Sequence, residues 1–264
     1  MDGATYYPFN DHLVAKAVPH QTSYPALALA VTKTGYAPNT PSTDMDMCSG
    51  SGYLFVFERS SSSAAWKVDL EPNVNLNAVP KLATTSTGYE TLVTSGKGLR
   101  TNPASIPATL ANELSSYVTS GNLTNLPNTI FGAKGQCWSI TNFRTGFETA
   151  STAGQSPTYQ LVPYTPSDLV AFRTANGGAL ALFSVEATLT ATAPAGDYLS
   201  QAPTPGQPSS YVIPAGQYSS DTQAYLLELA VVIPPAKSRG SAPFEVIRAY
   251  GGSLVGSGVP YNGS

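Results

Sequence analysis

Few residues in this chain could carry out acid–base chemistry, and they are far apart in the sequence. Histidine supplies most general bases, and only two histidines occur, His12 and His20. If a short helix contains His12, Pro19 ends it and His20 lies beyond it. The pattern therefore favours two solvated or hydrogen-bonded side chains over a catalytic or metal-binding pair.

Two glutamates, Glu186 and Glu228, lie inside long segments that alternate like β-strands. A pair of carboxylates can serve as general acid and general base, but the spacing that matters is spatial and cannot be read from the sequence. Because glutamate is rarely fully buried, a solvent-facing position is the simpler interpretation of each. No catalytic residue is predicted, and an enzyme that uses carboxylates and tyrosines inside a cavity is the alternative.

The common motifs of catalysis and cofactor binding are absent from the sequence. It contains no Gly-x-Ser-x-Gly, no Ser-x-x-Lys and no P-loop motif, which removes the usual signatures of serine hydrolases, penicillin-recognising enzymes and nucleotide hydrolases. Asp44 and Asp46 have the spacing of a calcium loop, but its glycine and closing glutamate do not follow. No metal site and no cofactor are predicted.

The only two cysteines are Cys48 and Cys137. In an exported protein such a pair would form one disulfide, and closing the long loop between them would stabilise the fold by roughly 4 to 5 kcal/mol in the chain-entropy model. The alternative is two unrelated thiols, because the sequence cannot place their Cα atoms within bonding range.

Composition points to an exported protein and excludes several partners. The charged fraction of the 264 residues is 11%, less than half of the roughly 25% typical of soluble domains, so uncharged polar side chains must cover much of the surface. The net charge of −3 gives no basic footprint for nucleic acid, which is not expected as a partner. No window approaches the roughly 20 apolar residues of a transmembrane helix.

The N-terminal segment does not read as a signal peptide. It has an acidic residue, Asp2, directly after Met1 and lacks a basic region followed by an apolar one. If the protein is exported, Met1 is therefore expected to be an artificial or fragment start.

Prolines and glycines divide the chain into short segments, most of which alternate apolar and polar residues, so the chain is predicted to be rich in β-strands. Short turns are expected to join 53–59 to 65–71 and 81–85 to 89–94 as antiparallel hairpins. The remaining predicted strands are 26–34, 168–174, 179–191, 224–233 and 244–252.

The clearest helix is predicted over 105–120, because its apolar residues recur every three or four positions. Ser105 is placed to cap its start, and Gly121 is placed to end it in a left-handed conformation. A shorter helix is predicted over 10–18, ending at Pro19.

Asn176, Gly177 and Gly178 lie between two predicted strands. Asn-Gly is the strongest short hairpin signal, because a type I′ turn needs positive φ at both central residues. A phosphate-binding loop would need a helix after the glycines, so a hairpin turn is predicted instead.

Four segments resemble a known family: WKVDLEPNVNLNAVPKLATTSTGYETLV, PASIPATLANELSSYVTSGN, LVAFRTANGGALALFSVEATLTA and ELAVVIPPAKSRGSAPFEVIRAYGGSLVGSG. Over about 210 residues the chain is similar to an uncharacterised family of actinobacterial exported proteins and lipoproteins, a domain of unknown function. The resemblance implies a secreted or envelope-associated protein. It also implies compact α+β halves similar to the nuclear-transport-factor (NTF2-like) or cystatin-like superfolds, and it implies no activity.

The sequence thus predicts two cone-like α+β domains, 1–100 and 101–264, each a curved antiparallel sheet packed by a helix. Trp66 is predicted to lie in the core. The 15 tyrosines suit half-buried sheet surfaces, and also sugar or peptide contacts. The expected function is a non-catalytic protein outside the cytoplasm that binds a partner protein or a small apolar ligand. The alternatives are the carboxylate enzyme and a structural spacer of the cell envelope.

Overall fold

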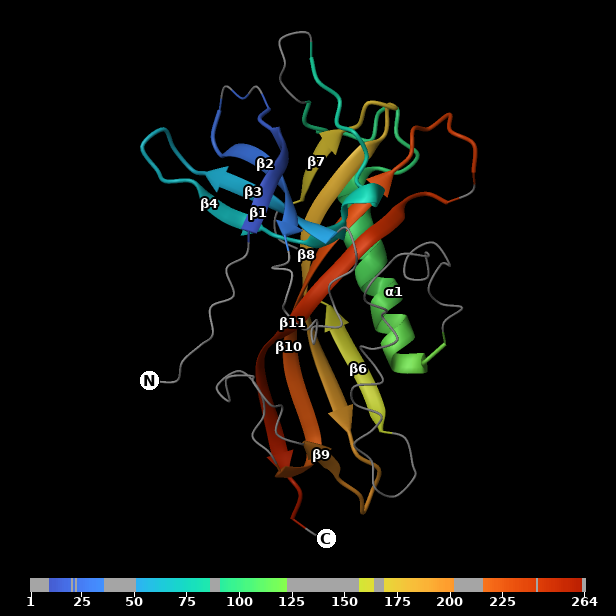
Figure 1. The fold of residues 1–264 in the computed structure, drawn as a ribbon. Helices are drawn as coiled ribbons and strands as arrows, with labels where there is room; N and C mark the ends of the chain where they lie inside the picture. The colour runs from blue at the N-terminus through green and yellow to red at the C-terminus, as the bar shows by residue number, and fades with distance from the viewer. Residues whose placement is uncertain are drawn as a thin grey trace.

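The computed structural model describes residues 10–19, 21, 23–35, 51–85, 91–122, 157–163, 169–201, 216–240 and 242–262. Within these residues the protein is broadly α+β and mostly β, with two antiparallel sheets and one α-helix (Figure 1). The strands of one sheet run along much of the molecule, and the other sheet lies beside their upper half in Figure 1.

The first sheet has five strands in the order β1-β2-β3-β4, and β5 also pairs with β3. Every pairing in it is antiparallel. Its strands are β1 (Asn10–Ala17), β2 (Ala26–Gly35), β3 (Ser51–Arg59), β4 (Lys67–Leu70) and β5 (Asn73–Asn75).

The second sheet has six strands in the order β11-β10-β8-β6, with β7 paired to β8 and β9 paired to β10. Its strands are β6 (Thr158–Pro163), β7 (Val170–Arg173), β8 (Ala179–Thr192), β9 (Leu199–Gln201), β10 (Gly216–Ile233) and β11 (Glu245–Pro260). The strands predicted over 224–233 and 244–252 are therefore confirmed but are longer than their apolar stretches.

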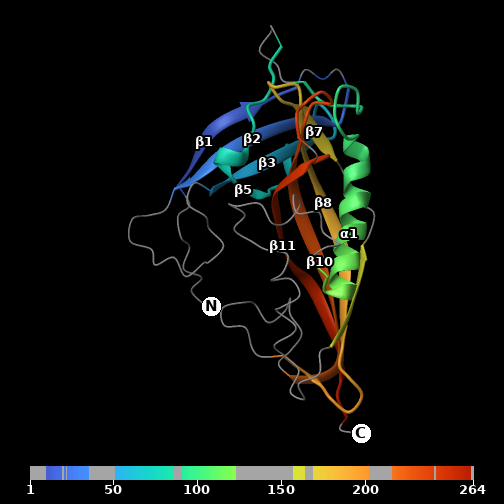
Figure 2. The same cartoon turned by 90° about the vertical axis from the view of Figure 1, so that its right-hand side faces the viewer.

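The molecule has three layers, with the six-stranded sheet in the middle (Figure 2). Successive side chains of a strand point to opposite faces, and β8 is buried on both. Leu180 and Leu182 join the core shared with the five-stranded sheet. Ala181 and Phe183 join the core beneath the helix α1 (Ile106–Ser120).

Helix α1 confirms the predicted stripe and the predicted end. Its buried side chains include Leu110 and Leu114, and Gly121 closes it at φ 69° with its N–H donating to the carbonyl oxygen of Tyr117. The predicted cap at the start is wrong, because Ser105 makes no side-chain capping bond. A 3₁₀ turn, Pro103–Ser105, precedes the helix, and the side chain of Asn102 caps that turn instead.

The turn between β7 and β8 joins antiparallel strands, as predicted, but it is not a type I′ turn. Gly177 has φ +86°, whereas no residue other than glycine in the described chain has positive φ, so Asn176 does not. The N–H of Gly177 donates to the carbonyl oxygen of Thr174. This bond fits a three-residue loop with glycine at its left-handed position.

The helix predicted over 10–18 is wrong, because these residues form strand β1, which pairs with β2. Ala17 is fully buried between the sheets. Tertiary pairing overrides local helix propensity here, as it often does for short segments.

The hairpin predicted from 81–85 and 89–94 is also wrong in the residues that the structure describes. Leu82 bridges to Thr174 and Leu92 bridges to Phe172, so both segments pair with the β7 region. Residues 86–90, at the predicted tip, lie outside the described residues.

Two helix-packed cones are not observed, which corrects the predicted architecture. The one α-helix in the described residues covers the six-stranded sheet, and the five-stranded sheet packs on the opposite face of that same sheet. The apolar residues on both faces of β8 make this arrangement favourable, because each face needs its own cover.

Candidate functional site

The outer face of the five-stranded sheet carries a row of aromatic side chains. Leu54 and Val56 of β3 are fully buried against the six-stranded sheet, so Tyr53, Phe55 and Phe57 point the other way. The ring centroids of Tyr53 and Phe55 are 5.6 Å apart, and those of Phe55 and Phe57 are 6.2 Å apart. Strand alternation thus places an aromatic row outside the core.

Arg59 continues this row and stacks on two further rings. Its guanidinium carbon lies 5.0 Å from the ring centroid of Trp66 and 5.7 Å from that of Tyr24. Both rings are exposed, at 43% and 45% respectively, so the prediction that Trp66 lies in the core is wrong. The reason is position, since Trp66 comes just before β4, which lies at the end of the strand order of its sheet.

We call Tyr24, Phe57, Arg59, Trp66 and Val68 the arginine–aromatic face. Val68 is 49% exposed and is paired with Phe57 across the sheet. The strand register also places Lys16 on this side, because Lys16 pairs with Ala30, which pairs with Phe55. The surface is therefore apolar and aromatic with basic groups at two points.

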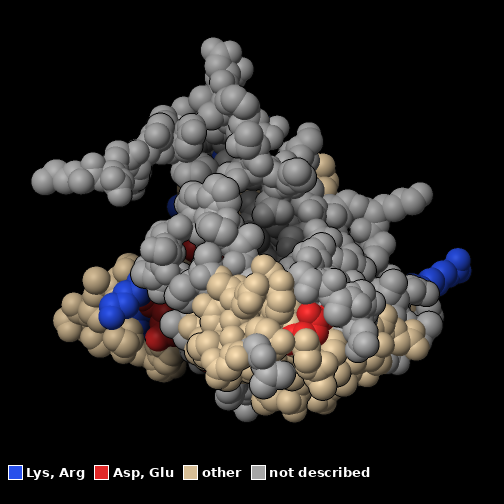
Figure 3. Space-filling model, turned by 90° about the horizontal axis from the view of Figure 1, so that it is seen from below, with Lys and Arg blue, Asp and Glu red and all other residues tan. Residues whose placement is uncertain are grey.

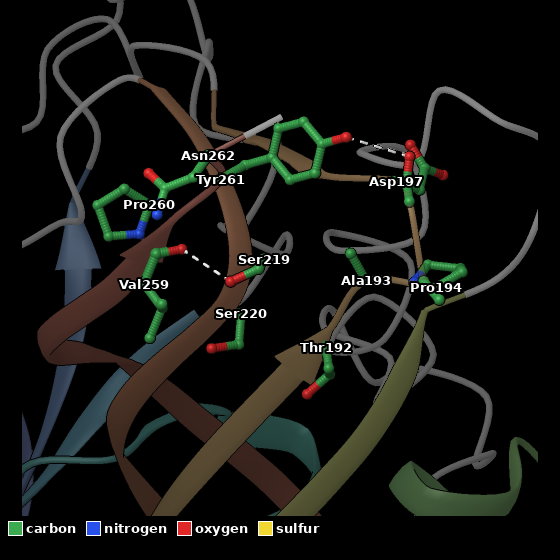
Figure 4. A pocket seen from close by; sticks show the side chains of 12 residues that line it. Thr192, Ala193, Pro194, Asp197, Ser219, Ser220, Val259, Pro260, Tyr261 and Asn262 are labelled. Atoms are coloured by element: carbon green, nitrogen blue, oxygen red, sulfur yellow. Dashed lines mark hydrogen bonds between the residues drawn. The ribbon is translucent and has the colours of Figure 1, made fainter. Parts of the chain in front are cut away.

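A cleft of about 390 Å³ lies at the far end of the six-stranded sheet (Figure 4). One wall is the turn after β8, from Thr192 to Asp197, and the other combines the start of β10 with the end of β11. Tyr261 reaches across, and its hydroxyl donates to the carbonyl oxygen of Gly196 at 3.2 Å. The cleft thus depends on three chain segments that are distant in the sequence.

A second cleft of about 370 Å³ shares Thr192 with the first. It lies between helix α1, through Ser115 and Thr119, and the paired strands β6 and β8. The Oγ of Ser115 donates to the carbonyl oxygen of Leu161 at 2.7 Å. Hydroxyl side chains therefore line both clefts, and the described residues at this end carry few charges (Figure 3).

Glu228 and Glu186, the two glutamates singled out in the sequence, lie on the same face of the six-stranded sheet. Glu186 pairs with Leu226, and Glu228 pairs with Ser184, so the two glutamates are diagonal neighbours, which in a regular sheet lie roughly 7 to 8 Å apart. Glu186 is exposed. The Oε1 of Glu228 accepts the backbone N–H of Glu71 at 3.1 Å, which ties Glu228 to the five-stranded sheet.

Burial raises the pKa of Glu228 above its ordinary value. The N–H of Glu71 opposes this rise, while the carboxylates of Glu71 and Asp69 add to it. A raised pKa beside another carboxylate suits a general acid, but the bond to Glu71 also gives Glu228 a structural role.

Several residues considered in the sequence analysis lie outside the described residues. These are Cys48, Cys137, His20, Asp44 and Asp46, and the side chain of His12 is not described either. Among the described residues, no group of three or more His, Cys, Asp or Glu side chains could hold a metal ion. In the same part of the chain, no helix is long and apolar enough to span a membrane.

No motif in the sequence points directly to the arginine–aromatic face or to the clefts. Alternation along 53–59 predicts that Tyr53, Phe55, Phe57 and Arg59 share one face of a strand. It does not predict whether this face or the opposite one packs against the rest of the protein.

Comparisons with curated proteins and with solved structures find no match. Residues 17–256 match one family, described as Domain of unknown function (DUF8094). This match spans most of the chain, from the end of β1 to within β11, and includes helix α1, and the protein therefore belongs to the DUF8094 family.

Proposed function

We propose that the protein is a non-catalytic binding protein that recognises a partner protein through the arginine–aromatic face. The observation that carries this proposal is the stacking of Arg59 between the exposed rings of Tyr24 and Trp66. Tryptophan, tyrosine and arginine are the residues most enriched among those that dominate binding energy at protein interfaces.

The preformed geometry of this face supports the proposal. Stacking on two rings and a weak 3.4 Å hydrogen bond from Nη2 to the hydroxyl of Tyr24 hold Arg59 in place. The Nε of Arg59 is shielded from solvent and has no hydrogen-bond partner within the described structure. Holding side chains in one conformation before binding lowers the entropy lost when a partner docks.

The partner expected is a protein surface with acidic and apolar side chains. Lys16 and Arg59 are basic groups that the strand register places on this face, and Val68 with Trp66 adds apolar area. Complementary charge fixes register and speeds association. The small apolar ligand expected from the sequence has weaker support, because hydroxyl groups line the two clefts.

Site-specific photo-crosslinking tests the proposal. A benzophenone amino acid replaces Val68 in one preparation and Val162 in another, since both valines are similarly exposed, at 49% and 45%, and lie in different sheets. Incubated with extract from the producing cells, the probe at position 68 should form a discrete adduct that Arg59→Ala abolishes. An adduct with a second copy of the chain, the same adduct from position 162, or no effect of Arg59→Ala would contradict the proposal.

We also propose that the protein works outside the cytoplasm, in line with its low charged fraction. Protein isolated from the cell envelope without reductant should weigh two hydrogens less than its reduced form, through a bond between Cys48 and Cys137. Two intact thiols in that preparation would argue against this compartment.

A carboxylate enzyme is the second candidate, because Glu186 and Glu228 are diagonal neighbours on one sheet face. Turnover of any substrate that Glu186→Gln abolishes would replace the binding function with this one.

A further inference from the structure

The two clefts at the far end of the six-stranded sheet have a chemistry that differs from that of the arginine–aromatic face. Serine, threonine and tyrosine predominate in the second cleft, whereas the first combines Thr192, Ser219, Ser220 and Tyr261 with alanine, proline and valine. The amides of Gln160 and Asn262 add further polar groups. No lysine or arginine lines either cleft. An anionic ligand would therefore have no opposite charge to pair with in the clefts. An apolar ligand would bury the hydroxyl groups without offering them hydrogen bonds, which costs free energy.

At least four of these hydroxyl groups already donate their protons to backbone carbonyls. That of Thr119, in the second cleft, donates to Ser115 at 2.8 Å. The hydroxyl of Tyr261 donates to Gly196, that of Ser219 donates to Val259 at 3.2 Å, and that of Ser115 donates to Leu161. A hydroxyl group that donates its proton in one hydrogen bond can still accept another through its lone pairs. A matching ligand must therefore bring several hydrogen-bond donors, as a polyol does.

The one carboxylate in the linings, Asp197, adds to the acceptors. It is only 6% exposed, and its Oδ1 accepts the backbone N–H of Tyr198 at 2.8 Å. The ring of Tyr198 packs against that of Tyr261 with centroids 5.4 Å apart. Tyrosine combines an apolar ring with a polar tip, which suits the mixed C–H and O–H surface of a sugar.

The shared residue Thr192 suggests the length of the ligand. Each cleft, at about 390 and 370 Å³, is near the lower end of the usual size of small-molecule sites. Because Thr192 lines both, one elongated molecule could occupy the two clefts at once. From the acceptor-rich linings, the tyrosine ring and the linked volumes, we infer that the clefts form a binding site for a neutral oligosaccharide.

This site is separate from the proposed protein-binding surface. In Figure 1 the end of β10 and β11 that forms the cleft lies far below strands β3 and β4. Arg59→Ala should therefore leave sugar binding unchanged, so the two proposals can fail independently.

Ligand-observed NMR on the full chain tests the inference. The probes are neutral trisaccharides of glucose, mannose and N-acetylglucosamine, with a sulfated disaccharide and a medium-chain fatty acid as comparators. We expect at least one neutral trisaccharide to bind with a Kd of about 1 mM or tighter, and neither comparator to bind as well.

Two variants and one control locate the binding. Thr192→Val keeps the side-chain shape but removes the hydroxyl common to both clefts, and should weaken binding about fivefold. Tyr261→Phe keeps the ring but removes the phenolic oxygen, which can accept from the ligand and which fixes the turn at Gly196, and should weaken binding to a similar extent. Thr109→Val makes the same change near the start of α1, outside both clefts, and should have no effect.

The inference fails if no neutral trisaccharide binds, or if the fatty acid or the sulfated sugar binds better. It also fails if Thr192→Val and Thr109→Val have equal effects. Circular dichroism of each variant confirms that a loss of binding does not come from unfolding.

Discussion

Glu113 is a carboxyl group whose ionisation opposes folding. It lies on helix α1, its Oε2 is buried without a hydrogen-bond partner within the described structure, and burial raises its pKa from 4.5 to about 7. A carboxyl group with a raised pKa in the folded state holds its proton more tightly than in the unfolded chain. The free energy of unfolding should therefore fall as the pH rises from about 4.5 to about 7, and then level off.

Glu113→Gln removes this ionisation while keeping the side-chain shape. The melting temperature of the variant should exceed that of the natural chain at pH 8, and the difference should vanish near pH 4. Glu186→Gln is the matched control, because it makes the same substitution at an exposed position on a strand. Parallel melting curves for the natural chain and Glu113→Gln between pH 4 and pH 8 would refute this account.

Arg59 connects two exposed aromatic rings that come from different segments of the chain. Trp66 and Tyr24 lie on different segments, and each would be an isolated exposed ring without the guanidinium between them. The cation–π contacts make these rings one ordered surface.

At the scale of the element, helix α1 ends where glycine permits the left-handed conformation. Gly121 has φ 69°, and a Cβ in this region costs roughly 1 to 2 kcal/mol. Gly121→Ala should lower the free energy of unfolding by about 1 kcal/mol in urea titrations. Gly121→Asn should cost less, because asparagine tolerates this region, and equal losses for the two variants would count against a backbone origin.

Strand β1 illustrates the limit of reasoning from one element at a time. Its sequence, NDHLVAKA, matches neither the period of a helix nor the alternation of a strand clearly. Pairing with β2 decides that it is a strand. Exposed Leu13 and Val14 lie where the register with β2 shifts, so the clean alternation that would have identified a strand is interrupted there.

At the scale of the whole molecule, the six-stranded sheet forms part of both cores. The core against the five-stranded sheet contains Leu182, and the core beneath α1 contains Leu110. Neighbouring residues of β8 contribute to opposite cores. If the helix or the five-stranded sheet came away, one face of β8 would be exposed to solvent, and the strand that also supports the remaining core would be destabilised. We expect thermal unfolding to be one cooperative transition.

Leu182→Ala and Leu110→Ala test this cooperativity. Both leucines are fully buried, and each substitution should lower the free energy of unfolding by about 2 to 5 kcal/mol. Calorimetry should show both variants shifting the same single transition. If domains 1–100 and 101–264 are independent folding units, as the sequence suggested, Leu110→Ala would instead shift one of two transitions.

The sequence by itself determined the local features of this protein. Alternation identified strands β2, β3, β7 and β8, and the apolar stripe with its terminal glycine identified helix α1. These features depend on residues close together in the chain, whose conformational preferences act over a few positions. The sequence likewise showed which common catalytic motifs are missing.

Only the tertiary structure decided which segments meet. It placed Leu82 and Leu92 beside β7 rather than beside each other, and exposed Trp66 next to Arg59. It also brought Thr192, Ser219 and Tyr261 together around one cleft. Strand register and layer order are set by the burial of both faces of the central sheet. This burial depends on contacts between segments from the whole chain, so no short stretch of sequence predicts it.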